Sequence, residues 1–197
     1  METFTQKTFA IPELAGISAK NIEEHLKLYA GYVKFSNQIQ SDMQELLKDS
    51  EKNAYIIGEM NRRFAFEFNG MRNHEYYFAS FVGGAKNLAD DSKLKAELTN
   101  QYGSFENWLA RFKATAMTRG IGWAMLYHDK KTNKLLTSWV DEQHLGQLNG
   151  CQVILALDMW EHAYVYDYPT SEKKKYVEAF FTNLNWEVIE NNFTSSF

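Results

Sequence analysis

The chain has 197 residues, of which 45% are hydrophobic, 23% charged and 15% aromatic. This composition is typical of a folded globular protein and excludes disorder, collagen-like repeats and low-complexity architectures. The net charge is −4, and no basic run is longer than Lys173 to Lys175. Nucleic acid is therefore not an expected partner, because proteins that bind a polyanion are usually basic.

The sequence carries no sign of a membrane segment or of export. The start lacks a basic stretch followed by an apolar run, and no window approaches the eighteen apolar residues of a transmembrane helix. Cys151 is the single cysteine, so an internal disulfide is excluded and a reducing compartment is favoured. We expect a cytoplasmic protein in which Cys151 is a small buried residue at a strand edge and not a catalytic thiol.

Helical periodicity dominates the first 120 residues, where apolar residues recur at three- and four-residue spacing. Ser18 is a plausible N-cap for the first helix, and Gly83 and Gly84 form a strong stop signal for the second. Gly120 closes the last helix of this region. Helices are predicted over residues 18–48, 51–82, 92–99 and 104–117.

After Gly120 the pattern changes to short apolar runs around a turn-forming segment at residues 129–133, which predicts a β-hairpin. Strands are predicted over residues 122–127, 135–140 and 152–157, and helices over 159–168, 171–182 and 185–191. The order predicts an α+β fold, with an N-terminal antiparallel helical hairpin over residues 1–84. The C-terminal domain, residues 85–197, is expected to hold a three-stranded antiparallel sheet with surrounding helices.

Two of the five histidines are predicted to face each other. His25 lies 25 residues before Ser50, and His74 lies 24 residues after it. If the two long helices pack antiparallel through a loop near Ser50, both imidazoles lie at similar height along the pair. His128, at the hairpin turn, is instead expected to be solvent-exposed and receives no function.

The segment from Leu157 to Tyr164 is the sharpest local feature. It places Asp158 at the end of a buried strand and His162 four residues later. A buried carboxylate is costly unless it is paired, and binding a cation is one way to offset that cost. Alternatively, Asp158 caps the following helix and His162 stacks among aromatic residues. The local spacing leaves these two interpretations equal.

At this point the chain resembles the iron/manganese superoxide dismutase family. The pattern Asp158-x-Trp160-Glu161-His162-Ala163-Tyr164 matches all six fixed positions of that family's signature. The resemblance extends in order from about residue 17 to residue 192. It is carried further by Ile22-Glu23 with His25, by Asn73-His74 with Tyr77, by Gly120-x-Gly122-Trp123 and by Asn185-Trp186-Glu187.

The resemblance implies one iron or manganese ion per subunit, held by His25, His74, Asp158 and His162. It also implies a homodimer or higher oligomer that converts superoxide to dioxygen and hydrogen peroxide. The donor set of three imidazoles and one carboxylate suits these metals. By the same resemblance, Tyr77, Trp123 and Trp160 pack around the metal, and Glu161 and Tyr164 reach across the dimer interface.

The sequence departs from the family pattern in four places. The gateway tyrosine of the family corresponds to Tyr32, which follows His25 by seven residues instead of eight, and Tyr29 replaces a histidine. Gly70 stands where many members have a glutamine that bonds the metal-bound solvent. His144 is the favoured replacement, with Gln143 and Gln147 as competitors. An arginine that often follows Asp167-Tyr168 is replaced by Pro169.

Three functional hypotheses follow. The first is a superoxide dismutase in which Tyr32 and His144 assist the reaction. The second is a non-catalytic metal-binding relative with the same fold, motivated by Gly70 and Tyr29. The third, a helical interaction module without a metal, requires the four ligand residues to align by accident. The choice between iron and manganese, and between dimer and tetramer, stays open.

Overall fold

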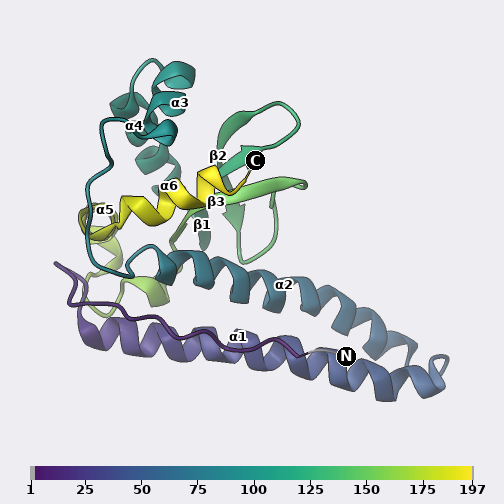
Figure 1. The fold of residues 1–197 in the computed structure, drawn as a ribbon. Coiled ribbons are helices and arrows are strands. Elements are labelled where there is room, and N and C mark those ends of the chain that lie inside the picture. Colours follow the sequence, from purple (N-terminus) through teal and green to yellow (C-terminus); the bar gives the residue numbers. More distant parts are fainter. Residues whose placement is uncertain (1–2, 197) are drawn as a thin grey trace.

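The computed structural model describes residues 3–196 and has the predicted α+β fold. Two long helices lie side by side as an antiparallel hairpin, and the sheet and the shorter helices lie on the α2 side of that hairpin (Figure 1). The helices before the sheet are α1 (Ala19–Leu46), the short 3-10 turn η1 (Leu47–Asp49), α2 (Ala54–Ala79), α3 (Lys93–Tyr102) and α4 (Phe105–Ala116).

Local signals set the ends of these helices, as the sequence predicts. The Ser18 hydroxyl accepts a hydrogen bond from the Asn21 backbone N–H at 3.1 Å, which caps α1. The side chains of Ser92 and Ser104 cap α3 and α4 in the same way. After α2 the chain turns through Gly83 and Gly84, whose φ values of 82° and 79° favour glycine.

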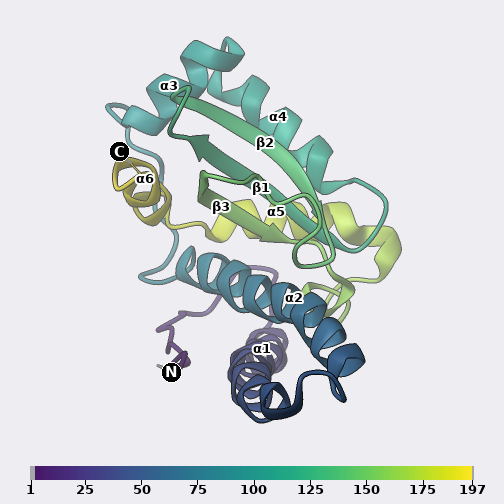
Figure 2. The ribbon, with the colours of Figure 1, turned by 90° about the vertical axis from the view of Figure 1, so that its right-hand side faces the viewer.

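Three antiparallel strands form the sheet, in the order β2-β1-β3 (Figure 2). They are β1 (Gly122–Asp129), β2 (Lys134–Asp141) and β3 (Cys151–Asp158). The predicted hairpin is confirmed, with Trp123 opposite Val140 on β2 and opposite Asp158 on β3. β1 is buried along nearly its whole length because it lies between the other two strands. Cys151, at the start of β3, is half-buried.

The chain after β3 differs from the sequence prediction. The predicted helix over residues 159–168 is wrong, because only a 3-10 turn, η2 (Glu161–Ala163), forms there. Trp160 is extended, with φ −66° and ψ 146°, and its backbone N–H donates to Oδ1 of Asp158. The apolar spacing of this segment therefore reflects packing around a turn. The remaining elements are the 3-10 turn η3 (Thr170–Glu172), α5 (Lys173–Asn183) and α6 (Trp186–Thr194).

The expectation that His128 is exposed is also wrong, because only 1% of its surface is accessible. Its Nδ1 lies 2.6 Å from the Ser196 hydroxyl, and its Nε2 lies 2.8 Å from Oδ1 of Asn133 in the hairpin turn. The ring thus joins that turn to the segment after α6, a contact between distant parts of the sequence.

The core is rich in aromatic residues and continues across the two parts of the fold. α5 packs onto α2, where the Phe180 ring stacks on Tyr77 at a centroid separation of 5.7 Å and contacts Phe81 edge-on. Trp108 and Phe112 of α4 are fully buried. Within residues 3–196, no helix combines the length and the apolar character that crossing a membrane requires.

Candidate metal centre

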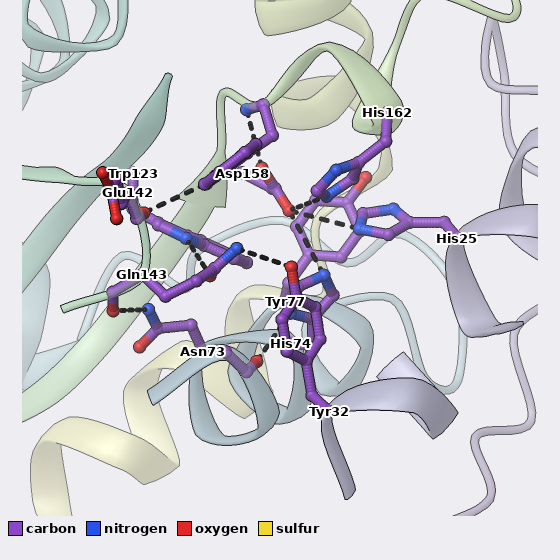
Figure 3. Close-up of polar contacts among 12 residues, drawn as sticks. His25, Tyr32, Asn73, His74, Tyr77, Trp123, Glu142, Gln143, Asp158 and His162 are labelled. Carbon is purple, nitrogen blue, oxygen red and sulfur yellow. Dashed lines mark hydrogen bonds and ion pairs between the residues drawn. The ribbon is translucent and has the colours of Figure 1, made fainter. Parts of the chain in front are cut away.

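Four side chains from four parts of the chain converge on one point (Figure 3). The Nε2 atoms of His25 and His162 lie 3.2 and 3.1 Å from Oδ2 of Asp158. Nε2 of His74 lies 3.5 Å from the same oxygen. One ligand atom from each of the four residues lies within 4.8 Å of all the others. The structure therefore brings together the four residues that the sequence singles out.

Each ligand candidate is placed by its own secondary-structure element. His25 lies in α1 and His74 late in α2, and the antiparallel packing brings their ring centroids to 4.9 Å, as their distances from Ser50 predict. Asp158 is the last residue of β3. The extended Trp160 and the turn η2 then return the chain so that His162 faces the same carboxylate.

Burial sets the protonation of the cluster. It lowers the pKa of His25, and it lowers the pKa of His74 to about 3, so both rings are neutral near pH 7. Burial alone would raise the pKa of Asp158, but the charge and hydrogen bond of His162 and the hydrogen bond of His25 hold it well below its usual value. The cluster thus presents neutral imidazoles to an ionised carboxylate.

This donor set fits a transition-metal ion. Nδ1 of His74 lies 2.6 Å from the Gly70 carbonyl oxygen, and an N–H there donates to that oxygen and leaves Nε2 with a free lone pair. Nε2 of His74 is buried and has no hydrogen-bond partner among the described residues. A buried nitrogen of this kind, aimed at a buried carboxylate, is satisfied by a shared cation. Imidazole and carboxylate donors without thiolate suit iron or manganese.

A chain of hydrogen bonds lies beside the cluster and ends at Tyr32. The indole N–H of Trp123 donates to Oε1 of Gln143 at 2.8 Å, and Nε2 of Gln143 donates to the Tyr32 hydroxyl at 2.9 Å (Figure 3). The Tyr32 ring lies 5.0 Å from the ring of His74. Seven residues after His25, Tyr32 therefore still reaches the face of α1 that carries the ligand.

The structure favours Gln143 over His144 as the polar group beside the cluster, contrary to the sequence preference. Gln143 is fully buried, whereas His144 is half-buried and its ring contacts Phe66 at 5.8 Å. The cause lies in the preceding residue, since Glu142 has a φ of 51° and turns the Gln143 side chain inward. An unusual backbone angle at a glutamate has no signal in the sequence.

Gln147, the other competitor, contacts the backbone that carries Gln143. Its Nε2 donates to Oδ1 of Asn73 at 3.1 Å, and Nδ2 of Asn73 donates to the Gln143 carbonyl oxygen at 3.0 Å. Asn73 precedes His74 on α2. The loop after β2 is therefore fastened directly to a ligand-bearing helix, which fixes the position of Gln143 relative to the cluster.

The three expected packing aromatics all contact ligand residues. The Trp123 ring lies 5.0 Å from His74, and the Tyr77 ring lies 5.0 Å from His25. The Trp160 ring stacks on His162 with an interplanar angle of 19°, and its indole N–H donates to the Glu142 carbonyl oxygen. These rings exclude water from the imidazoles and limit their rotation.

Tyr29, which replaces a family histidine, belongs to another network. Its hydroxyl lies 3.3 Å from Oε1 of Glu75 and accepts the Lys7 backbone N–H. Glu75 also pairs with the Lys7 ammonium at 2.7 Å and with Arg72 at 2.9 Å. This position therefore fastens the N-terminal segment to the helical hairpin and does not contact the four ligand candidates.

The two expected interface residues differ in exposure. Glu161 is exposed, but Tyr164 is only 3% exposed and stacks on Tyr176 inside the chain. Little of the Tyr164 side chain is thus free to contact a partner. The exposed apolar surface of this segment belongs to its neighbours Val165 and Tyr166.

Comparison with known proteins agrees with this geometry. The family model described as iron/manganese superoxide dismutases, C-terminal domain, matches residues 90–192. The manganese superoxide dismutase of Mycolicibacterium fortuitum is 33% identical over 175 residues, which cover 87% of this chain and 82% of that protein.

The chain belongs to the iron/manganese superoxide dismutase family.

Members of the family with either metal in their name are similar to this chain to nearly the same degree. The iron superoxide dismutase of Cupriavidus metallidurans is 32% identical over 187 residues, covering 93% of this chain and 92% of that protein. The iron superoxide dismutase of Aquifex pyrophilus is 30% identical over 185 residues, covering 91% of this chain and 85% of that protein. Overall identity therefore does not select iron or manganese.

Proposed function

We propose that this protein is a superoxide dismutase that holds one iron or manganese ion per subunit through His25, His74, Asp158 and His162. When bound, the ion supplies the one-electron chemistry by which two superoxide anions and two protons become dioxygen and hydrogen peroxide. The observation that carries the proposal is the convergence of three imidazole Nε2 atoms on one buried carboxylate oxygen. Membership of the family adds the reaction class.

The role of Tyr32 in this proposal is to hold a proton at the entrance of the site. Burial raises the pKa of the Tyr32 hydroxyl, and the charges of Asp158 and Glu67 act in the same direction, so the group stays protonated. Gln143 donates to the Tyr32 oxygen. The Tyr32 proton is therefore free to point toward a bound anion.

Gln143 is proposed to orient Tyr32 and to donate a hydrogen bond into the site. Trp123 fixes the amide, because its indole N–H can pair only with the carbonyl oxygen of Gln143. The amide nitrogen must then face Tyr32. A donor that is fixed before the reaction stabilises developing negative charge without a reorganisation cost.

We also propose that two copies associate through the segment that carries His162. The His162 side chain is 20% exposed, whereas the other three ligand side chains are fully buried. Its Nε2 faces Asp158, which leaves Nδ1 directed away from the cluster. An exposed carboxylate, Glu161, lies next to it in the chain. In a two-fold dimer, Glu161 accepts a hydrogen bond from the partner subunit's His162.

The deciding experiment measures superoxide dismutation by protein reloaded separately with iron and with manganese, normalised to bound metal. We expect fast turnover with at least one metal. Asp158→Ala should lose both metal and activity, whereas Asp91→Ala, which removes an exposed carboxylate, should retain both. Full activity of Asp158→Ala would overturn the proposal.

The same experiment separates the non-catalytic relative, which Gly70 and Tyr29 motivate. That alternative requires one bound metal per chain without turnover in either loaded form. It is weakened by the placement of Gln143, which supplies an amide beside the cluster from a different loop. Turnover by either loaded form would exclude it.

A further inference from the structure

Asp158 lies on an unpaired edge of the sheet, and this affects its backbone. β3 is an outer strand in the order β2-β1-β3. The Met159 N–H donates to the Gly122 carbonyl oxygen at 2.8 Å, which makes the opposed residues Trp123 and Asp158 a non-hydrogen-bonded pair. The Asp158 carbonyl therefore points away from β1, toward the side where no further strand lies.

Tyr176 of α5 supplies the donor that the sheet does not. Its hydroxyl oxygen lies 2.9 Å from the Asp158 carbonyl oxygen, and the side chain is fully buried. Burial raises the pKa of Tyr176 well above its ordinary value, so the hydroxyl remains protonated. A buried carbonyl without a donor is destabilising, and this contact removes that cost at the residue that carries the carboxylate.

The Tyr77 hydroxyl orients that of Tyr176. The two hydroxyl oxygens lie 3.1 Å apart, and both side chains are fully buried. A tyrosine hydroxyl has one proton to donate, and the Asp158 carbonyl can only accept. The Tyr176 proton is therefore committed to Asp158, and the Tyr77 proton is donated to the Tyr176 oxygen.

This pair of tyrosines contacts all parts of the ligand cluster. Tyr77 follows His74 by three residues on α2, and its ring lies 5.0 Å from His25. The Tyr176 ring stacks on Tyr164, two residues after His162, at 5.3 Å. The hydroxyl chain thus joins α2, α5 and the end of β3 underneath the four ligand atoms.

We propose that Tyr176, oriented by Tyr77, is a positioning residue that fixes the Asp158 backbone and thereby the place of its carboxylate among the three imidazoles. Two hydrogen bonds then hold Asp158 from opposite sides. The Trp160 N–H holds Oδ1 at 2.8 Å, and Tyr176 holds the backbone carbonyl. The inference rests on the proposed function, because it assumes that Asp158 binds the metal ion.

The experiment measures the rate at which manganese-loaded protein releases its metal to excess chelator, well below the unfolding temperature. Tyr176→Phe removes only the hydroxyl, and we expect release about 10-fold faster, the low end of the range for groups that support ligands. Tyr77→Phe should act in the same direction with a smaller effect. Tyr76→Phe is the matched control, since its hydroxyl lies on the same helix and accepts from Gln152 at the far end of β3.

The outcomes separate this inference from the proposed function. Release by Tyr176→Phe at the rate of Tyr76→Phe, from protein that dismutates superoxide normally, would overturn the inference alone. Failure of the unaltered protein to retain iron or manganese would overturn both. If Tyr176→Phe does not fold, an unchanged release rate in Tyr77→Phe overturns the inference. The double variant should release metal no faster than Tyr176→Phe, because both hydroxyls act through one contact.

Discussion

The backbone of Gly70 lies directly against the ring of Tyr32. A Cβ atom at position 70 would lie 2.5 Å from Cδ1 of Tyr32, closer than real Cβ contacts allow. The tyrosine therefore occupies the space that any side chain at this position needs. The amide that many family members place here comes instead from Gln143, which reaches the Tyr32 hydroxyl from the loop after β2. Gly70 and Gln143 are two parts of one arrangement.

We predict that Gly70→Ala displaces Tyr32. The added methyl group meets the ring edge-on, so the protein should lose about 1–3 kcal/mol of unfolding free energy, as overpacked sites do. Turnover should fall by about 10- to 100-fold, because the Tyr32 hydroxyl leaves Gln143. Urea unfolding and dismutation by metal-loaded protein measure the two effects.

Gly58→Ala is the matched control for this variant. Gly58 lies in the same helix, α2, and a Cβ there meets no atom within 4 Å. That substitution should raise the unfolding free energy by about 0.5–1 kcal/mol, because alanine favours a helix more than glycine does. Equal unfolding midpoints for the two variants would refute the steric argument at Gly70.

The sequence predicts the features that depend on local signals and on periodicity. Serine caps and paired glycines mark the helix ends, and the spacing of His25 and His74 about Ser50 places their rings together. These predictions succeed because a helix converts sequence separation into height in a simple way. The four ligand candidates are recognisable for the same reason, together with the signature from Asp158 to Tyr164.

The features that the sequence does not predict depend on tertiary contacts. His128 is buried by residues near the other end of the chain, and the segment after Asp158 forms a turn because Oδ1 accepts the Trp160 N–H. Selecting Gln143 over His144 requires the positive φ of Glu142. Tyr176 resembles any other aromatic residue of its helix until the free edge of β3 is known.

The contrast between Gln143 and His144 gives a second prediction. Gln143→Ala should reduce turnover by about 100-fold, since it removes the oriented donor beside Tyr32. His144→Ala should leave turnover unchanged, because that ring packs on Phe66. Steady-state dismutation at equal metal content measures both. A larger loss in His144→Ala would restore the sequence-based preference.

The buried histidines predict how the metal-free protein responds to acid. The folded-state pKa of His74 is about 3, below its model value of 6.5, so between these values the unfolded chain binds a proton that the folded protein does not. Stability is therefore complete above pH 6.5 and falls as the pH drops, by about 1.4 kcal/mol per pH unit for each such group. The pKa of His25 is lowered in the same direction.

Urea unfolding of metal-free protein between about pH 7 and pH 4 measures this dependence. His74→Leu should flatten the acid slope by about one proton, since it removes one of the two groups. Asp158 acts only below its usual value of 3.8, outside that range. An unchanged slope in His74→Leu would show that His74 takes up its proton in the folded protein.

The last prediction concerns the proposed dimer. Glu161→Ala should weaken association by about 30-fold or more, because truncating one partner of a buried charged hydrogen bond costs about 2 kcal/mol or more. Two-fold symmetry makes the contact occur twice in each dimer. Glu106→Ala is the control, since Glu106 is exposed at the start of α4. Sedimentation across a concentration series measures the dissociation constant, and equal values for both variants would remove Glu161 from the interface. Because His162 is the one ligand candidate with an exposed side chain, dissociated Glu161→Ala should also release its metal faster than the control.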